Sequence, residues 1–220
     1  MYILMAIGTI LLAYLIGSIN FAIIFSKLFT GKDIREVGSG NAGATNVLRS
    51  AGFIPGLLTF LFDAIKGFAA CFIARLVFEY ILENTQNTLF NPLAGSYVCL
   101  LFVMLGHIFP VFFKFKGGKA VAVSVGTYAV CCYPAILLGL ATFAISLLIS
   151  KIVSVSSLLA TVVVVSMSIV FMDFSGPVLP QIICTVLAGL LVFIKHKENI
   201  KRLKKGEEKK ITIGAKKANG

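Results

Sequence analysis

The chain has 220 residues, of which 58% are hydrophobic, and its mean hydropathy of +0.97 excludes a soluble domain of ordinary composition. We therefore expect an integral membrane protein. The formal net charge is +11, but the sequence lacks a soluble domain with stacking aromatic residues on a basic surface, so we expect no nucleic-acid partner. Most of the excess charge lies in the C-terminal tail, which is expected to face the cytoplasm and to contact anionic membrane lipid.

Apolar segments long enough to cross a membrane occur along most of the chain. A hydrocarbon core of about 30 Å needs about 20 helical residues. The segments that satisfy this length are Ile3–Phe29, Phe53–Leu82, Leu93–Phe113, Val155–Met172 and Leu179–Ile194. A further stretch, Ala120–Ser150, is too long for one crossing, and Pro134 near its middle predicts a helical hairpin of two short spans. The expected fold class is all-α: a polytopic membrane helical bundle with about seven transmembrane helices.

The positions of Lys and Arg predict the orientation of this bundle. Basic residues flank the first, third and fifth loops and fill the tail from Lys195 onward, whereas the loop Glu83–Asn87 has none. Because cytoplasmic loops carry the excess of Lys and Arg, the N-terminus is expected outside and the C-terminus inside. We expect residues 1–200 to form a single membrane domain and residues 201–220 a basic cytoplasmic tail that is partly disordered.

The first cytoplasmic loop contains a polar, glycine-rich stretch, Gly38–Arg49, that is typical of an anion-binding site. Glycines let backbone N–H groups turn toward an anion, the Ser, Thr and Asn side chains add neutral donors, and Arg49 adds a permanent charge. Its G-x-G-x-x-G spacing would indicate a dinucleotide site only after a β-strand, and this loop joins two membrane helices. The predicted phosphate-binding residues here are Gly38, Gly40, Asn41, Gly43, Thr45 and Asn46.

A second glycine-rich loop opens the helix that begins near Ala120. Gly117 and Gly118 precede Lys119 at the helix N-terminus, an arrangement that suits phosphate. It is not a Walker A motif, because Phe113 stands where Gly is required and Ala120 where the metal-binding Ser or Thr is required. ATP hydrolysis is therefore not expected. We predict that Gly117 and Gly118 contact a substrate and that Lys119 supplies positive charge.

Three further polar groups lie at or near the same side of the membrane. His196 and Asn199 are three residues apart, so both can reach a common pocket from the end of the last helix. Ser154 either donates to the same anion or caps its helix. Within the second span, Asp63 and Lys66 have the spacing of an intrahelical ion pair. Because each central charge costs roughly 2.5–3.5 kcal/mol in a membrane, this pair is expected to position the loop or the ligand.

Taken together, these residues resemble the bacterial acyl-phosphate-dependent glycerol-3-phosphate acyltransferases, and the resemblance spans the whole chain. The matching segments are Gly38–Arg49, Asp63 with Lys66 and Gly67, Gly106–Lys119, and His196 with Asn199. The resemblance implies a membrane enzyme that moves a fatty acyl group from acyl phosphate to the 1-hydroxyl of glycerol 3-phosphate. The products would be lysophosphatidic acid and inorganic phosphate, in the first step of phospholipid synthesis.

The resemblance also implies a location and a set of site residues. The protein would be a multi-pass protein of the bacterial inner membrane, with its active site on the cytoplasmic side. The implied catalytic residues are Ser39, Arg49, Lys119, His196 and Asn199. Lys66 and Ser154 would contact substrate, whereas Asp63, His107 and Glu207 would give structural support. Glu207 is the natural match for the glutamate expected after the His196 motif, with Glu208 beside it as the alternative.

The chemistry of this reaction is compatible with the residues present. Acyl phosphate already carries a good leaving group, so direct attack is sufficient and we expect no cofactor, metal or covalent nucleophile. Arg49, Lys119 and loop N–H groups would offset the repulsion between two anionic substrates and stabilise developing charge. The proton would pass either to His196 or to a substrate phosphate. The acyl tail would lie in a groove between helices, open to lipid, in a monomeric protein.

Two other classes of protein fit these residues less well than the acyl-phosphate-dependent enzyme. A membrane carrier for phosphate or an organic phosphate would also need glycine loops and basic residues, but a carrier usually places its site near the midplane between repeats. Here the polar groups cluster at one face. The remaining glycerol-phosphate acyltransferases carry a His followed five residues later by Asp, whereas Phe112 follows His107 and Lys201 follows His196 at that distance. We therefore predict the acyl-phosphate-dependent enzyme.

Overall fold

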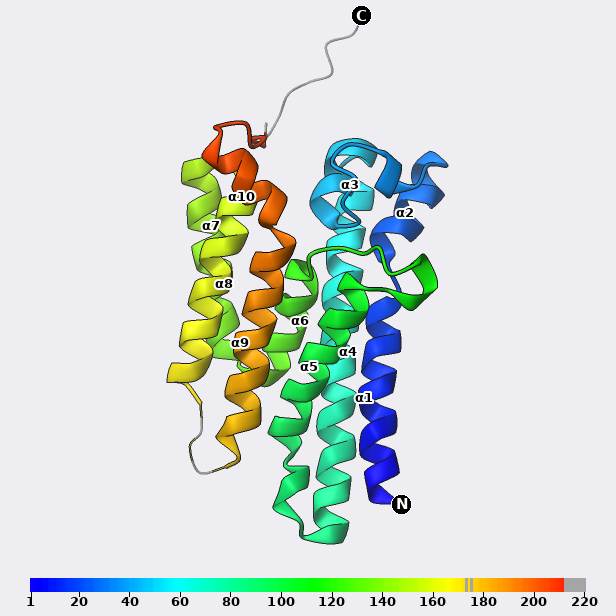
Figure 1. Cartoon of the computed structure of the whole chain (residues 1–220), viewed down its shortest axis with the longest axis vertical. Helices are drawn as coiled ribbons and strands as arrows, with labels where there is room; N and C mark the ends of the chain where they lie inside the picture. The colour runs from blue at the N-terminus through cyan, green and yellow to red at the C-terminus, as the bar shows by residue number, and fades with distance from the viewer. Residues whose placement is uncertain (173, 175, 212–220) are drawn as a thin grey trace, which may run out of the picture.

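The computed structural model describes residues 1–172, 174 and 176–211, which fold into a helical bundle (Figure 1). The α-helices are α1 (Tyr2–Ser18), α2 (Phe21–Thr30), α3 (Ala44–Ala51), α4 (Phe53–Thr85), α5 (Pro92–Ile108), α6 (Val121–Cys131), α7 (Tyr133–Ser150), α8 (Val153–Val170), α9 (Val178–Lys195) and α10 (Lys197–Lys204). Short 3-10 turns occur at η1 (Ile34–Glu36), η2 (Thr88–Phe90) and η3 (Val111–Phe113). Since these described ranges contain no β-strand, the all-α prediction is confirmed for them.

Six helical segments within the described residues are long and apolar enough to cross a membrane. They are Tyr2–Thr30, Phe53–Thr85, Pro92–Phe113, Tyr133–Ser150, Val153–Val170 and Val178–Lys195. The hairpin expected within Ala120–Ser150 is present, because the backbone at Cys132 leaves the helical region and Pro134 lies in the first turn of α7. However, the 11 residues of α6 span only about 16 Å. The first arm of the hairpin is therefore too short to cross the hydrocarbon core alone.

The first predicted span, Ile3–Phe29, is broken into α1 and α2. In a continuous helix the N–H of Ile23 would donate to the carbonyl of Ile19, but here it donates to the side chain of Asn20 at 3.1 Å. Asn20 thus caps α2 and releases the Ile19 carbonyl, which accepts from Lys66 of α4 at 2.5 Å instead. Gly31, at φ +69°, ends α2 in the left-handed conformation that favours glycine.

Close helix contacts hold the bundle together. In Figure 1, α1, α4 and α5 lie on one side and α7, α8 and α9 on the other, and α6 packs against both α4 and α7. Glycines mark two of the tightest crossings. A Cβ on Gly106 of α5 would meet the carbonyl oxygen of Tyr14 in α1, and a Cβ on Gly126 of α6 would meet that of Ala64 in α4. These residues let neighbouring backbones approach closely, as small residues do between membrane helices.

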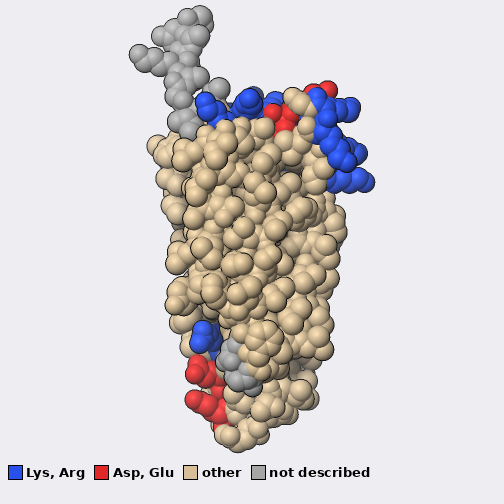
Figure 2. Space-filling view, turned by 90° about the vertical axis from the view of Figure 1, so that its left-hand side faces the viewer, with Lys and Arg blue, Asp and Glu red and all other residues tan. Residues whose placement is uncertain are grey.

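Charged side chains gather at the ends of the molecule. Figure 2 shows Lys and Arg concentrated at the end of the molecule where α10 lies in Figure 1, above a long band without charged side chains on the face shown. Large apolar side chains such as Leu61, Ile145 and Leu190 are exposed in the helices that form this band. An apolar belt with charged ends fits a lipid bilayer. The helices α3 and α10 lie at the basic end (Figure 1).

Part of the predicted tail is structured. The expected boundary at residue 200 falls inside α10, and the following residues return to the bundle. The backbone N–H of Ile211 donates to the carbonyl of Lys151, at the turn between α7 and α8, at 2.7 Å. Residues 205–211 therefore form a strap, a name kept below for this segment. The remainder of the predicted disordered tail, residues 212–220, lies outside the described residues.

The glycine contacts predict how substitutions affect stability. Gly106→Ala should lower the midpoint of thermal unfolding, because its methyl group overlaps a backbone atom of α1, and overpacking typically costs about 1–3 kcal/mol. Gly8→Ala is the matched control, since nothing lies within 4 Å of a Cβ placed there and alanine favours a helix by roughly 1 kcal/mol. Melting curves of the purified variants in detergent check this, and equal midpoints would contradict the packing described.

Candidate active site

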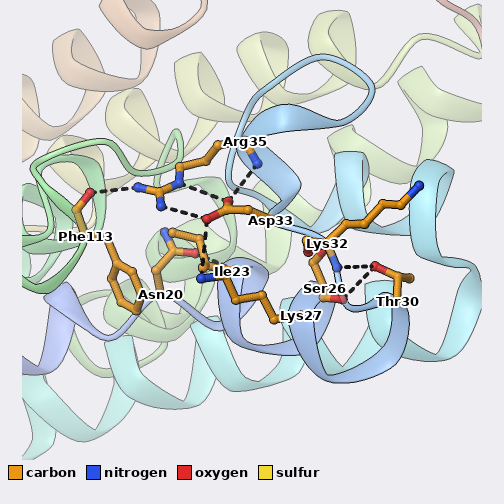
Figure 3. A network of polar contacts seen from close by, with 9 residues as sticks. All are labelled: Asn20, Ile23, Ser26, Lys27, Thr30, Lys32, Asp33, Arg35 and Phe113. Atoms are coloured by element: carbon orange, nitrogen blue, oxygen red, sulfur yellow. Dashed lines mark hydrogen bonds and ion pairs between the residues drawn. The ribbon is translucent and has the colours of Figure 1, made fainter.

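The first loop is anchored by an ion pair that joins it to the second loop. Asp33 caps η1, and its carboxylate accepts from Arg35 Nη2 at 2.7 Å and lies 3.7 Å from Lys27 Nζ (Figure 3). Hydrogen bonding from Arg35 lowers the pKa of Asp33 to about 2. Arg35 Nη1 also donates to the carbonyl of Phe113 at 2.9 Å. A single arginine thus fixes the position of both glycine-rich loops relative to each other.

Asn46 organises the glycine-rich stretch from within. Its Oδ1 accepts the N–H of Ser39 at 3.0 Å, and its Nδ2 donates to three backbone carbonyls between Ile34 and Asn41 at 2.9–3.1 Å. A Cβ on Gly38, at φ +63°, would meet the side chain of Asn46. Asn46 was predicted to bind phosphate. In the structure its amide is hydrogen-bonded to the loop backbone, so Asn46 shapes the loop, and it also lines the cavity described below.

Most of the polar residues of the stretch line a common cavity. The helix α3 begins at Ala44, and its first turn lines the cavity through Ala44 and Thr45, an orientation that favours an anion at the helix N-terminus. Ser39 and Arg49 also line it. The exposed Arg49 guanidinium donates through Nη2 to the carbonyl of Lys209 in the strap at 3.1 Å. The positively charged guanidinium of Arg49 is therefore paired with an uncharged backbone carbonyl rather than with a carboxylate.

The second loop is built on His107. The N–H of Gly118 donates to the carbonyl of His107 at 3.1 Å, and the N–H of Gly117 donates to that of Ile108 at 3.2 Å. A Cβ on Gly118 would meet the His107 ring, which explains the glycine at this position. The loop then delivers Lys119, whose ammonium donates to the side-chain oxygen of Asn199. Both predicted glycines therefore hold the loop rather than line the cavity.

A buried polar network underlies this loop. The ammonium of Lys66, 4% exposed, lies 2.7 Å from the carboxylate of Asp63, 2.5 Å from the Ile19 carbonyl oxygen and 3.0 Å from His107 Nδ1. An ammonium has three hydrogens and no acceptor, so three partners match its full capacity. The predicted Asp63–Lys66 pair is thus present. Asp63 and His107 reach the cavity wall, whereas Lys66, predicted to contact substrate, is not among the cavity residues.

The end of α9 contributes the third predicted group. The Nδ1 of His196 donates to the carbonyl of Val192 at 2.8 Å, which leaves Nε2 as the lone-pair nitrogen of the neutral ring. Burial lowers the pKa of His196 to about 4, and the neighbouring Lys119 contributes in the same direction. Asn199 receives the hydrogen bond from Lys119 and donates to Glu208 at 2.6 Å. Both His196 and Asn199 are buried and line the cavity.

The structure brings Glu208, the alternative to Glu207, into contact with the other polar groups. The Glu208 carboxylate accepts from Asn199, from Ser154 at 2.9 Å and from Arg202 Nε at 2.6 Å, whereas Glu207 is exposed on the surface of α10 and the strap. Burial alone would raise the pKa of Glu208, but these hydrogen bonds lower it below its ordinary value. Ser154 is therefore a donor within the site, and its partner is this carboxylate.

These groups surround one cavity of about 490 Å3. One end is polar and lies at the basic end of the molecule. The other end runs between the helices and is lined by apolar side chains. Predicted residues on the wall are Gly38, Ser39, Asn41, Gly43, Thr45, Asn46, Arg49, Asp63, His107, Lys119, Ser154, His196 and Asn199. The predicted residues that do not line it are Gly40, Lys66, Gly117, Gly118 and Glu207. Sequence reasoning missed Arg202, Lys209 and Tyr128, which also line it.

Lys119 is a cation of the cavity whose pKa depends on its surroundings. Burial lowers its pKa to about 8; Glu208 partly offsets this, whereas Arg202 and Arg49 lower the pKa further. The polar end therefore holds several positive charges around one carboxylate. Such an excess of positive charge in a partly desolvated cleft favours binding of an anion, which in turn would stabilise the protonated form of Lys119.

Comparison with known proteins identifies the family. The family model described as "Glycerol-3-phosphate acyltransferase" matches residues 7–206. Glycerol-3-phosphate acyltransferase 2 of Bacillus anthracis is 42% identical over 207 residues, which cover 94% of this chain and 100% of the relative. The chain belongs to the glycerol-3-phosphate acyltransferase family. The corresponding protein of Bartonella henselae is 40% identical over 201 residues, covering 91% and 89% of the two chains.

Solved structures of this acyltransferase family share the fold. Crystal structures of PlsY (YgiH), an integral membrane glycerol 3-phosphate acyltransferase, superpose with TM-scores of 0.80 for the glycerol 3-phosphate form and 0.77 for the lysophosphatidic acid form. Their sequence identities are 33% and 32%, and each covers 94% of this chain and 96% or 95% of the other. The family resemblance read from the motifs is thereby confirmed, along with the all-helical membrane bundle.

The two adjacent glutamates provide a matched test of the site. Glu208→Gln should lower both acyltransferase activity and the midpoint of thermal unfolding, because hydrogen bonds to a charged group contribute roughly 1.5–3 kcal/mol each. Glu207→Gln should change neither. Because the pKa of Glu208 is lowered in the folded state, its carboxylate stabilises the wild type at neutral pH, and this stabilisation is lost as the pH falls through that pKa. The unfolding midpoint of Glu208→Gln should lack this pH dependence. Thermal melts between pH 3 and 7 measure it; similar behaviour of the two variants would exclude the assigned role.

Proposed function

We propose that this acyltransferase moves a fatty acyl group from acyl phosphate to the 1-hydroxyl of glycerol 3-phosphate, giving lysophosphatidic acid and inorganic phosphate. The observation that carries the proposal is the shape of the cavity, which joins a cationic end to an apolar end. A product with a phosphate head and a fatty tail has the same two-part chemistry. Small-molecule sites commonly combine an apolar wall with a few convergent polar groups in this way.

The cationic end supports binding of the two substrate phosphates. Arg49 and Lys119 currently contact a backbone carbonyl and an amide oxygen, both of which are neutral. A phosphate oxygen would form stronger, charge-assisted hydrogen bonds with the same side chains. Ser39 and the N-terminal turn of α3 would add neutral donors. Concentrating these donors offsets the repulsion that two anionic substrates experience at close range.

The chemical step needs alignment more than a strong nucleophile. The 1-hydroxyl oxygen attacks the acyl carbon, a new ester C–O bond forms, and the bond from that carbon to the phosphate oxygen breaks. The hydroxyl proton leaves either to the free Nε2 of His196 or to the departing phosphate. Lys119 and Arg49 stabilise the negative charge that develops on the leaving group. Asn199 orients Lys119, and the Asp63–Lys66–His107 network fixes the loop that carries it.

The same reasoning supports an orientation in the membrane. We place the basic end, with α3, α10 and the strap, in the cytoplasm, because Lys and Arg are concentrated there (Figure 2). The N-terminus then lies outside, α6 and α7 form a hairpin that enters from the cytoplasmic side and returns to it, and residues 1–211 act as a single catalytic domain. In a bacterium the corresponding compartment is the inner membrane, where both substrates are available from the cytoplasmic side.

A reconstituted assay tests the proposal. Purified protein in lipid, supplied with palmitoyl phosphate and glycerol 3-phosphate, should release lysophosphatidic acid and inorganic phosphate in equal amounts, and palmitoyl-CoA should not replace the acyl phosphate. Arg49→Ala should lower the rate about 100-fold or more, as loss of a charge-stabilising donor does in other enzymes. The control is Lys32→Ala, which removes an exposed charge from the same loop outside the cavity. Folded protein that forms no lysophosphatidic acid would refute the proposal.

A further inference from the structure

The lining of the cavity ends at a definite residue on each of four helices. The polar end is marked by Lys119 before α6, Ser154 at the start of α8 and His196 at the end of α9. The cavity residues farthest from these markers along each helix are Tyr128 of α6, Ile136 of α7, Val165 of α8 and Ala188 of α9. Tyr128, Val165 and Ala188 are eight to eleven residues from the markers of α6, α8 and α9, which corresponds to about 12–17 Å of helix, and Ile136 lies 14 residues before Ser150, the last residue of α7. These four residues form the floor of the cavity.

Tyr128 is the largest residue of this floor, and its ring packs against a second buried ring. Its side chain is 2% exposed, and its ring meets that of Tyr97 in an edge-to-face contact with centroids 6.5 Å apart. Tyr97 is equally buried and donates its hydroxyl to the carbonyl of Cys131 at 3.4 Å. By contrast, the Tyr128 hydroxyl lies near Thr185 of α9 but forms no hydrogen bond of good geometry in the described part of the chain. The ring, rather than the hydroxyl, is the feature that the surrounding helices fix in place.

We infer that Tyr128 limits the length of the acyl chain that this enzyme accepts. The inference rests on the proposed acyl transfer and places the fatty tail inside the cavity, with its methyl end against the Tyr128 ring. Because the tail comes from a lipid environment, burying further methylenes gains little free energy. A chain that is too long, however, must displace a ring held by a second ring in a close-packed core. Discrimination therefore acts against long chains.

An alternative path for the tail makes the opposite prediction. A groove open to lipid, as expected from the sequence, would let long chains leave the cavity sideways between helices. Such chains would never meet Tyr128, and the enzyme would show no upper limit set by this residue. The two paths can be separated by varying the chain length and the floor residue together.

The experiment compares saturated acyl phosphates from decanoyl to eicosanoyl with wild type, Tyr128→Phe and Tyr128→Ala. Tyr128→Phe keeps the ring and removes only the unpartnered hydroxyl, so its kcat/KM profile should match that of the wild type. Tyr128→Ala should extend the profile to longer chains. For each enzyme, kcat/KM of the shortest acyl chain that the wild type rejects is divided by kcat/KM of the chain that the wild type prefers. This ratio should be about tenfold higher in Tyr128→Ala than in the wild type, since one methylene in an apolar pocket changes specificity by at least that factor.

Binding of product provides an independent readout. The rise in unfolding midpoint caused by lysophosphatidic acids of the same chain lengths ranks their affinity without requiring turnover. If no acyl phosphate is a substrate, the proposed function fails, but this ranking still tests the floor. Tyr128→Leu replaces Tyr128→Ala if the alanine variant does not fold. Identical length profiles for the small-residue and Phe variants in both assays would overturn the inference.

Discussion

The buried ammonium of Lys66 is the interaction on which the site depends. A charge inside a membrane bundle is tolerated only when its partners are in place, and removing one partner of a buried pair typically costs about 3–5 kcal/mol. Here the partners come from three helical segments: Asp63 of α4 itself, the carbonyl of Ile19 at the α1–α2 break, and His107 of α5. The break exists because Asn20 takes over the N–H of Ile23, which frees that carbonyl. One cation therefore couples the α1–α2 break, α4 and the end of α5 that supports the second loop.

This coupling explains how a lipid-soluble chain presents a polar site. His107 supports the loop that delivers Lys119, and Arg35 ties that loop to the glycine-rich stretch through Phe113. The strap closes the arrangement, since Glu208 gathers three donors and the carbonyl of Lys209 receives Arg49. Arg49 and Lys119 are thus held by neutral partners that phosphate can replace, while Arg35, Lys66 and Arg202 are paired with carboxylates. The fatty tail has a separate, apolar space between the helices.

Much of this architecture is readable from the sequence, because hydropathy marks the long helices, Pro134 marks the hairpin, and the glycine loops carry Arg49 and Lys119. The remainder depends on contacts between distant segments. A single polar residue, Asn20, breaks an apolar run that is otherwise long enough for one helix. Asn46 is of a residue type that often binds ligands, but its side-chain amide forms hydrogen bonds with the backbone of its own loop. Glu207 and Glu208 are equivalent in sequence, and only the path of the strap distinguishes them. In the sequence nothing distinguishes Tyr128 from the other aromatic residues, and only the packing of α6 shows that it lines the cavity.

The central claim, that partly buried cations bind the substrate phosphate, is tested most directly by titration calorimetry with glycerol 3-phosphate between pH 7 and 10. The phosphate is a dianion throughout this range, because its second pKa is about 6. In the empty site Lys119 loses its proton near pH 8, so affinity should fall as the pH rises through that value and binding should take up a proton. Lys119→Met should bind weakly without this dependence. Affinity that is constant across the range in the wild type, or retained in Lys119→Met, would contradict the account.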